Sequence, residues 1–393
     1  MDTRRGAACP ARTMNEKRLP RIMYVANARM PTEKAHGIQI AKMCEAFIEQ
    51  GVDIELVVPS RGTDVRSLKE FYGLRTDVPM TRRWVPDWYG SRVGFAASSL
   101  VFAIQYFLHL GWRRYIRREG FIIYTTDLDQ FSFFLIPFLG VPYFAEMHDA
   151  KKKRWAFRLL FWRVRATIAV NDIIKKELEA VFSIPPENIM MRPNGYDAGL
   201  FRHPEEKIAA RHALGLPPDK NIALYVGRIY PWKGLDTLVH TARLLPDVLF
   251  YLVGGTADAL QMLGEGIPPN LVCAGSRDHA EIPRWLWAAD VLLVFGTEKD
   301  AYSYFHTSPM KLFEYMAAFR PIVASRTPAI ETAVSEEKVF FCAPDDSADA
   351  AERIQYVLTH SDEAHRKVAH AAGGLYSWDM RAADITDFML MHL

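Results

Sequence analysis

The chain has 393 residues, of which half are hydrophobic and about a quarter charged, with a net charge of only +2. This composition is ordinary for a soluble globular protein, and the length favours two domains over one core. Four scattered cysteines without a Cys-x-x-Cys pair argue against a zinc ribbon or a disulfide framework, and they favour a reducing compartment.

The first twenty residues are polar and basic. They lack the apolar stretch of a signal peptide, so we do not expect export. Residues 1–19 are predicted to form a flexible tail, and Met14 is an alternative start within it.

Charge is unevenly spread along the chain. Residues 1–200 hold 30 basic and 21 acidic side chains, a net of +9, whereas residues 201–393 have a net of −7. A basic half suggests an anionic surface or an anionic acceptor nearby. Solubility is the simpler reading of charge alone, and nothing in the sequence predicts nucleic-acid binding.

Two successive alternations of strand and helix run along the chain. In the first, a strand at 21–26 leads to a helix at 38–50, which ends at Gly51, and then to a strand at 52–58. This βαβ unit is the element of a doubly wound sheet. The remaining strands of the first alternation are expected at 121–124, 142–146 and 167–170.

A polar connector with one helix, residues 203–220, separates the two alternations. The second alternation has a helix at 235–244. Its strands are expected at 222–226, 249–253, 271–274, 291–295 and 322–324. The fold class predicted is therefore α/β with two Rossmann-like domains.

Two further segments stand out. Residues 93–112 carry no charge over 20 positions, so a membrane span, a buried helix and a membrane-facing helix all fit their composition. Residues 151–165 carry seven basic residues and no acid, with Trp155 and Trp162 on one stripe if the segment is helical. Such a segment is typical either of a helix on an anionic membrane or of a half-buried helix with a solvated face.

The segment YVGRIYPWKG, residues 225–234, places two cations beside a predicted helix start. Arg228 directly follows the strand, and Lys233 precedes the helix. Backbone N–H groups and the helix dipole favour an anion there, and a guanidinium binds phosphate through two hydrogen bonds. The spacing is not that of a Walker loop. It indicates a diphosphate site.

A second helix start lies in residues 303–325. Ser308-Pro309 opens a predicted helix, because proline suits the first helical turn. Lys311 and Glu314 project from its first turns. Glu314 is placed to accept hydrogen bonds from a ribose diol.

These motifs together resemble the family 4 retaining glycosyltransferases, which have the GT-B fold. YVGRIYPWKG and TSPMKLFEYMAAFRPIVAS match the C-terminal half of that family. The other matching features are the loop with Gly37, the pair His148-Asp149, residues 192–197, and residues 376–378 followed by an amphipathic helix. The resemblance covers about residues 20–393.

The resemblance implies a domain organisation. Residues 20–200 would form an N-terminal acceptor domain, and residues 201–375 a donor domain for the nucleotide sugar. The last helix, within 376–393, would cross back onto the first domain. The donor cleft would lie between the two domains.

It also implies roles for single residues. Arg228 and Lys233 would neutralise the departing diphosphate, and Glu314 would hold the ribose. His148 would sit beside the donor sugar, and Gly37 would let the first loop approach the phosphates. The catalytic set is then His148, Arg228, Lys233 and Glu314. The donor-binding set is Gly37, Gly227, Arg228, Lys233, Gly275, Ser276, Arg277, Thr307, Ser308, Lys311 and Glu314.

The sequence departs from the family at one position. Where the family has the first of two glutamates seven residues apart, this chain has His306. His306 and Asp149 are candidates for sugar contact.

Asp127-Leu-Asp129 resembles the metal motif of another glycosyltransferase fold. The GT-B resemblance needs no metal or cofactor, and these carboxylates could instead contact the acceptor.

The predicted function is sugar transfer from a nucleotide-diphosphate sugar to a saccharide or lipid-linked acceptor, with retained anomeric configuration. Polysaccharide biosynthesis at the cell surface is the expected setting. The expected location is the cytoplasm or, peripherally, the inner face of the cytoplasmic membrane. The alternatives are a GT-B epimerase or phosphorylase, and a non-catalytic module that binds sugar nucleotides.

Overall fold

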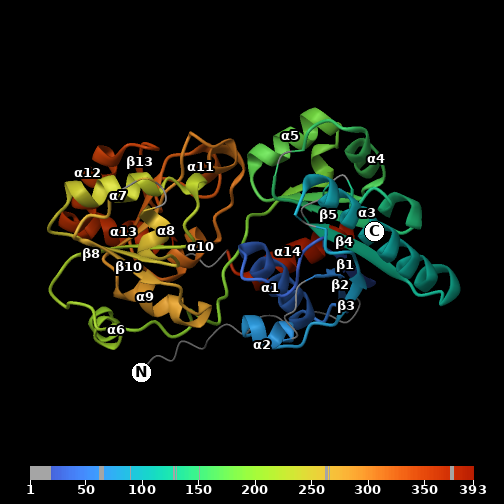
Figure 1. Cartoon of the computed structure of the whole chain (residues 1–393), viewed down its shortest axis with the longest axis horizontal. Helices are drawn as coiled ribbons and strands as arrows, with labels where there is room; N and C mark the ends of the chain where they lie inside the picture. Colours follow the sequence, from blue (N-terminus) through green and yellow to red (C-terminus); the bar gives the residue numbers. More distant parts are fainter. Residues whose placement is uncertain are drawn as a thin grey trace, which may run out of the picture.

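The computed structural model describes residues 19–393 apart from 62–65, 89, 127–128, 130, 150, 262–263, 265 and 372–375. Almost all of the expected tail, residues 1–18, lies outside this range. Two parallel sheets dominate the structure, and each has helices on both faces (Figure 1). This confirms the predicted α/β class with two Rossmann-like units.

The first sheet has seven strands in the order β3-β2-β1-β4-β5-β6-β7. Its central strands are apolar and buried on both faces, as parallel strands between two helix layers must be. The strands are β1 (Arg21–Val25), β2 (Ile54–Ser60), β3 (Met80–Trp84), β4 (Phe121–Thr126), β5 (Tyr143–Met147), β6 (Ala166–Ala169) and β7 (Ile189–Met191).

Helices and short turns of helix connect these strands. They are α1 (Ala35–Glu49), α2 (Leu68–Tyr72), α3 (Arg92–Gly111), η1 (Trp112–Ile116), η2 (Ile136–Leu139), α4 (Trp155–Arg163), α5 (Asp172–Phe182) and η3 (Pro186–Asn188). Helix α1 packs in one core layer with β1 and β2, whereas α3, α4 and α5 contribute to the layer on the opposite face.

The second sheet repeats this plan with six strands in the order β10-β9-β8-β11-β12-β13. In both sheets the strand order reverses beside the first strand of the unit, β1 or β8, which is the switch point of a doubly wound fold. The strands are β8 (Ile222–Val226), β9 (Leu249–Val253), β10 (Leu271–Gly275), β11 (Val291–Val294), β12 (Ile322–Ser325) and β13 (Phe340–Cys342).

The helices of the second unit follow the same alternation. They are α6 (Lys207–Leu214), η4 (Pro231–Lys233), α7 (Leu235–Leu244), α8 (Ala257–Gln261), η5 (His279–Glu281), α9 (Ile282–Ala288), η6 (Tyr302–His306), α10 (Met310–Ala317), α11 (Pro328–Glu331), α12 (Ser347–Thr359) and α13 (Ser361–Ala371). The predicted connector helix is α6, and the predicted helix 235–244 is α7.

The final helix, α14 (Trp378–Met391), crosses back to the first unit. Its apolar residues Trp378, Ile385 and Met389 are buried in the same core as α1 and β1, and in Figure 1 the red helix lies among blue elements. The predicted return of the C-terminal helix is thereby confirmed.

The two connections between the units run side by side. Tyr196 N donates to Tyr376 O at 2.9 Å, and Trp378 N donates to Tyr196 O at 3.0 Å. A Cβ atom on Gly195 would lie 2.8 Å from Tyr376 O, so glycine is needed where the two strands of chain meet. The two connections are therefore packed against each other, and we call this contact between residues 195–196 and 376–378 the joint between the units.

Several local expectations differ from the structure. Helix α1 begins at Ala35, so Gly37 lies in its first turn and not in a loop. The basic segment 151–165 is helical only over α4, so Lys151, Lys152, Lys153 and Arg165 lie outside the helix that the composition suggested. Pro309 is the N-cap of α10 and not in its first turn. Strand β3, with the sequence MTRRW, was missed because an edge strand needs little apolar character.

Candidate active site

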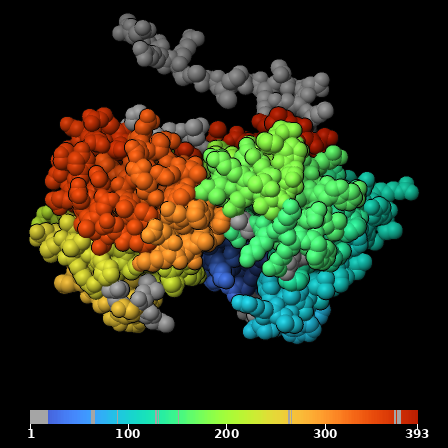
Figure 2. Space-filling model, turned by 90° about the horizontal axis from the view of Figure 1, so that it is seen from above, coloured from blue at the N-terminus to red at the C-terminus, as the bar shows by residue number. Residues whose placement is uncertain are grey.

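The sequence-predicted residues gather where strands of the two sheets end. His148 follows β5, Gly227 follows β8, and Gly275 ends β10. In parallel α/β sheets the carboxyl ends of the strands form the ligand-binding edge. Figure 2 shows a groove between the first unit (green) and the second (orange), with blue residues at its base.

Gly227 allows the chain to turn sharply out of β8. Its φ is +150°, and its N–H donates to Val253 O at 2.7 Å. A Cβ atom on Gly254 would lie 2.8 Å from the carbonyl of Gly227, so the two loops touch backbone to backbone. This close packing fixes the direction in which the following loop leaves the sheet.

Lys233 is held over that loop. Its Nζ donates to Arg228 O at 3.1 Å and lies 5.0 Å from the ring centroid of Tyr230 and 5.4 Å from that of Trp232. Burial lowers the pKa of Lys233 to about 8, and the charge of Arg228 adds to the effect. The exposed Arg228 makes no ion pair with any residue that the structure describes.

Lys311 supplies a third cation. Its ammonium is buried without a hydrogen-bond partner among the described residues, 3.7 Å from the ring centroid of Tyr225. Burial lowers its pKa well below the ordinary value, and the nearby charge of Lys233 lowers it further, whereas Glu314 opposes the shift. The three cations, Arg228, Lys233 and Lys311, are called the cationic cluster below.

Glu314 lies one turn beyond Lys311 on α10. Its Oε1 is 2.9 Å from Nε2 of His279, a residue that the sequence analysis missed. Burial disfavours the charged imidazole, but the hydrogen bond and charge of Glu314 outweigh burial and raise the pKa of His279. This contact fixes one carboxylate oxygen and leaves the other without a protein partner in the described part of the chain.

On the first unit, His148 rests on a buried carboxylate. Its Nε2 lies 2.5 Å from Oε1 of Glu146, two residues earlier on β5. Gln39 donates to the same oxygen at 2.9 Å, and Tyr124 donates its hydroxyl to Oε2. The ring orientation of His148 is therefore set by a buried carboxylate near the carboxyl end of β5.

Arg381 of α14 completes this network. Its guanidinium lies 2.9 Å from Oε1 and 3.1 Å from Oε2 of Glu146, and both side chains are almost fully buried. Arg381 also donates to Pro193 O at 2.8 Å, on the connection between the units. Burial would raise the pKa of Glu146, but Arg381 and His148 outweigh it and hold the pKa far below its ordinary value. Neither residue of this pair was predicted from the sequence.

His306 meets the first unit directly. Its Nε2 is 3.3 Å from Oε1 of Glu177, and its Nδ1 is 3.6 Å from Oδ1 of Asp149. Asn171 donates to the carbonyl oxygens of Phe305 and His306, both at 3.3 Å. The structure thus brings the two candidates for sugar contact together across the groove.

The segment after His306 is also tied to the first unit. Asn194 Nδ2 donates to Ser308 O at 3.0 Å, and Asn194 N donates to the Ser308 hydroxyl at 3.4 Å. Thr307 and Ser308 are half-buried. The start of α10, next to Lys311 and Glu314, therefore lies against the joint between the units.

Gly37 is closely surrounded by Tyr72 and Thr32, a packing that the sequence did not predict. A Cβ atom there would lie 2.4 Å from the hydroxyl of Tyr72 and 2.5 Å from Cγ2 of Thr32. The residue is therefore required for close packing at the start of α1.

Ser276 and Arg277 are exposed after β10, with the Arg277 guanidinium 5.7 Å from the ring centroid of Trp285.

Asp127 lies outside the described residues, and the carboxylate of Asp129 accepts hydrogen bonds from within the protein. Its Oδ1 accepts hydrogen bonds from the backbone of Phe131 at 2.7 Å and of Ser132 at 2.8 Å. Its Oδ2 accepts from Asn27 Nδ2 at 3.0 Å. This carboxylate shapes the turn after β4. Among the residues described, no group of three His, Cys, Asp or Glu side chains is arranged to hold a metal ion.

Two Rossmann-like units joined by a crossing helix, with an ionic groove between them, define the GT-B class of proteins. Solved structures share this fold. Sucrose-phosphate synthase from Thermosynechococcus elongatus superposes with a TM-score of 0.74 at 19% identity, covering 95% of this chain and 98% of the other. The Anabaena protein HepE in complex with UDP and glucose gives 0.72 at 18% identity, covering 95% and 99%.

Family models match most of the chain. The model described as Glycosyltransferase Family 4 matches residues 37–200, and the model described as Glycosyl transferases group 1 matches residues 220–360. The chain belongs to this glycosyltransferase family, as the sequence motifs indicated.

Curated relatives agree with this assignment. The D-inositol 3-phosphate glycosyltransferase of Jonesia denitrificans is 25% identical over 241 residues, 56% of this chain and 55% of that protein. D-inositol 3-phosphate glycosyltransferase 2 of Catenulispora acidiphila is 29% identical over 242 residues, 56% and 54%. The chain spans about half the length of the curated relatives it matches.

Proposed function

We propose that this protein transfers a sugar from a nucleotide-diphosphate sugar to a saccharide or lipid-linked acceptor. The observation that carries the proposal is the cationic cluster. Arg228, Lys233 and Lys311 meet at the carboxyl edge of the second sheet, and none has an ion-pair partner in the described part of the chain. A diphosphate would supply the missing negative charge.

The cluster suits the chemistry of sugar transfer. As the bond between the sugar and the diphosphate breaks, negative charge develops on the leaving phosphate oxygens. Preorganised cations stabilise that charge more strongly in a site shielded from water. We assign this role to Arg228, Lys233 and Lys311.

The remaining residues would position the donor. The free oxygen of Glu314 would accept a hydrogen bond from the ribose, because His279 holds the other oxygen. His148 would contact the sugar from the first unit, with its ring fixed by Glu146. His306 and Asp149, which meet across the groove, would line the sugar end of the site.

We further propose that transfer retains the anomeric configuration and needs no metal ion. Support comes from membership of the family and from the cationic cluster, which would neutralise the diphosphate. Proton NMR of the first product reports the anomeric configuration. Activity that survives EDTA supports metal independence, and activity that returns only with added Mg²⁺ contradicts it.

We propose that the protein works in the cytoplasm, peripherally at the inner face of the cytoplasmic membrane, in the synthesis of surface glycans. The net charge of +9 on residues 1–200 supports a location near anionic lipid. A lipid-linked acceptor would be presented there. Fractionation of cells that express the full chain, before and after a high-salt wash, tests this location.

The test of the proposed function is a thermal-shift panel of UDP, GDP, ADP, CDP and their sugars. UDP comes first because the HepE structure contains it. A ligand that binds only the folded state raises the melting midpoint. At a hundredfold excess over its Kd it increases the free energy of unfolding by about 2.7 kcal/mol. The donor that the panel selects is then offered to saccharide and lipid-linked acceptors.

The outcomes separate the alternatives. Transfer to an acceptor supports the proposal. An isomerised sugar formed without acceptor would indicate an epimerase, and binding without any turnover would indicate a non-catalytic module. No shift with any member of the panel would contradict the assignment of the cationic cluster.

A further inference from the structure

Helix α3 and the adjoining turn η1 expose a long apolar face. Along one side, Leu100, Ile104 and Leu108 are 42%, 46% and 63% exposed, and the line continues through Trp112 to Ile116, which is 71% exposed. On the opposite side of the helix, residues such as Phe102 and Tyr106 are fully buried against the sheet. Soluble proteins rarely leave such a continuous apolar stripe in contact with water.

The segment Arg92–Ile116 is long and apolar enough to span a membrane by length and composition. However, its inner face belongs to the core of the first unit, where Phe102, Tyr106 and Leu110 pack with the strands. Crossing a bilayer would remove these side chains from that core. The helix is therefore suited to lie in the plane of a membrane surface and not to cross it.

The apolar stripe continues onto neighbouring elements. Phe138 of η2 is 53% exposed, and Trp155 and Trp162 of α4 are 72% and 74% exposed. Tyr115 Oη donates to Leu139 O at 3.0 Å, which joins η1 to η2. In Figure 1 both α3 and α4 lie on the outer side of the first unit, away from the second unit. We call this surface of α3, η1, η2 and α4 the α3–α4 face.

Basic side chains surround the apolar ones. Arg114 and Arg158 are exposed on η1 and α4. The guanidinium of Arg117 lies 4.8 Å from the ring centroid of Trp112, and that of Arg163 lies 5.5 Å from that of Trp162. Residues 151–170 contain no acidic residue at all. Aromatic and basic side chains together are the composition that favours the headgroup region of an anionic bilayer.

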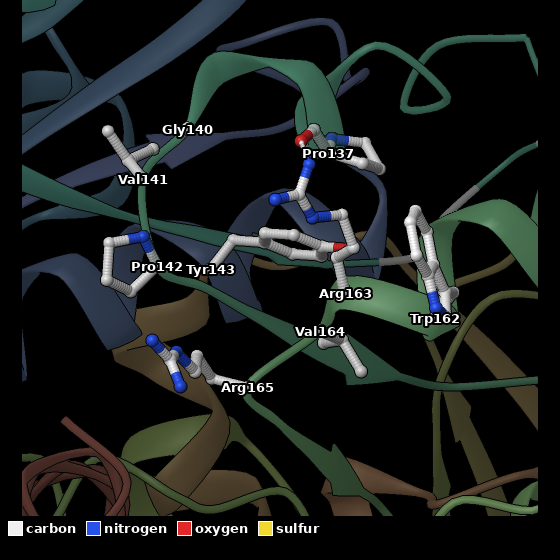
Figure 3. A pocket seen from close by; sticks show the side chains of 9 residues that line it. All are labelled: Pro137, Gly140, Val141, Pro142, Tyr143, Trp162, Arg163, Val164 and Arg165. Carbon is white, nitrogen blue, oxygen red and sulfur yellow. Dashed lines mark hydrogen bonds between the residues drawn. The ribbon is translucent and has the colours of Figure 1, made fainter.

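A cavity of about 480 Å³ opens between η2 and α4. Figure 3 shows the ring of Tyr143 between the side chains of Arg163 and Arg165, with Trp162 beside Arg163. Arg163 Nη1 donates to Pro137 O at 3.2 Å, which holds that side chain in place. The guanidinium of Arg165 has no hydrogen bond or ion pair to any residue that the structure describes. Two guanidinium groups that line one cavity from different sides make it attractive to a phosphate group.

We propose that the α3–α4 face docks on an anionic bilayer and that the cavity between Arg163 and Arg165 takes the phosphate of a lipid headgroup. Charge complementarity selects this occupant, because the same basic face on a second copy of the chain would repel it. The inference rests on the proposed peripheral location and is independent of sugar transfer.

The test uses flotation of the full chain with phosphatidylcholine vesicles that contain or lack phosphatidylglycerol, without any nucleotide sugar. We expect flotation with the anionic vesicles at low salt and much less with neutral ones. The double variant Trp155→Ser/Trp162→Ser should reduce the bound fraction with both kinds of vesicle. If the protein stays at the bottom of the gradient at every salt concentration, docking is excluded.

A matched pair of variants tests the cavity. Arg163→Gln/Arg165→Gln and Arg114→Gln/Arg158→Gln remove the same charge from the same face, but only the first pair lies at the cavity. A loss of about fivefold per arginine is expected from general attraction. The first pair should lose at least tenfold more than the second, and glycerol phosphate in solution should compete with the vesicles for the wild-type protein.

Equal losses in the two double variants would overturn the headgroup site. The double variant Arg202→Gln/Lys220→Gln, which changes exposed basic residues of the second unit, should float like the wild type. Thermal shifts with nucleotides are measured without vesicles, so a failure of docking and a failure of donor binding are distinguished. Unchanged melting midpoints verify that the exposed variants are folded.

Discussion

Glu146 on the first unit and Lys311 on the second are both charged groups buried beside the groove, but their surroundings differ. The carboxylate of Glu146 has contacts with Arg381, His148, Gln39 and Tyr124. The ammonium of Lys311 has an aromatic ring beneath it and no hydrogen-bond partner among the described residues. On the first unit the buried charge of Glu146 is neutralised by Arg381, whereas on the second unit the described residues provide no such partner for Lys311.

The difference indicates what each side is built to do. A buried charge without partners costs several kcal/mol, so a protein keeps one only where something offsets the cost. At Glu146 the offset is internal, and the carboxylate joins β5, His148 and the C-terminal helix. At Lys311 the negative charge of a bound donor's diphosphate would offset this cost. The lowered pKa values of Lys233 and Lys311 are consistent with this, because they show that the protein itself supplies too little negative charge there.

The largest expected effect is at Glu146. Glu146→Gln leaves the buried guanidinium of Arg381 without its counter-charge, and we expect a loss of about 3–5 kcal/mol in the free energy of unfolding. Urea denaturation measures it. Arg381→Met alone should be similarly costly, whereas the double variant Glu146→Gln/Arg381→Met should regain part of the loss because no unpaired charge remains.

A positioning role for Glu146 has a separate readout. If Glu146 orients His148, the double variant will remain slow even where its stability is restored, and its pH–rate profile will shift. A double variant with normal turnover and an unchanged profile would show that the network only holds the fold together.

Lys233→Ala tests the unbalanced side. Removing one preorganised cation should reduce turnover by about 10²–10³-fold, since the charge of the leaving diphosphate is then stabilised less. Steady-state rates with the donor selected by the thermal-shift panel measure the loss. The fold should persist, because Lys233 makes no ion pair among the residues described. A rate within a few-fold of wild type would refute the phosphate assignment.

Lys311→Met should have opposite effects on the free and bound protein. Replacing an unpaired buried ammonium with an apolar side chain of similar length should stabilise the free protein by about 1–2 kcal/mol. The same variant should show a smaller thermal shift with the nucleotide that the panel selects. If the free protein is destabilised, the ammonium has a structural partner and the comparison with Glu146 fails.

Much of the second unit was readable from the sequence. Strands β8, β9 and β10 are apolar runs closed by glycine, and Arg228, Lys233 and Glu314 lie near strand and helix ends. Local signals of this kind survive folding because each depends on its own segment. The cations were therefore predicted, although the position of Lys311 over Tyr225 was not, since these residues lie far apart in the chain.

The network around Glu146 could not be predicted in the same way. Glu146 and Arg381 are 235 positions apart, and only the return of α14 brings them together. Two signals were present in the sequence. Glu146 is a charged residue within a strand that is otherwise apolar, and Arg381 lies beside the apolar positions 382 and 385 of the last helix. A buried strand and a buried helix face that each carry one opposite charge indicate a pair.

A pH dependence should distinguish the cationic cluster from the balanced pair of Glu146 and Arg381. The pKa of Lys233 is about 8 in the folded protein and about 10.4 in an unfolded chain. Between these values the unfolded state binds more protons at this residue, so Lys233 should contribute a rise in the free energy of unfolding with pH, which is read as the difference between wild type and Lys233→Arg. Donor affinity should fall in the same window, by at most about tenfold per pH unit for one lysine, because the diphosphate selects the charged form.

Thermal midpoints with and without the selected nucleotide, from about pH 7 to about pH 10, measure both slopes. Lys233→Arg is the matched control, since a guanidinium stays charged throughout this range; both slopes should become smaller without loss of binding, and the lowered pKa of Lys311 contributes to what remains. Glu146 should contribute nothing here, because its depressed pKa lies far below the window. Slopes that are identical in Lys233→Arg and wild type would place the titrating group elsewhere, with Lys311 the first to examine by Lys311→Arg.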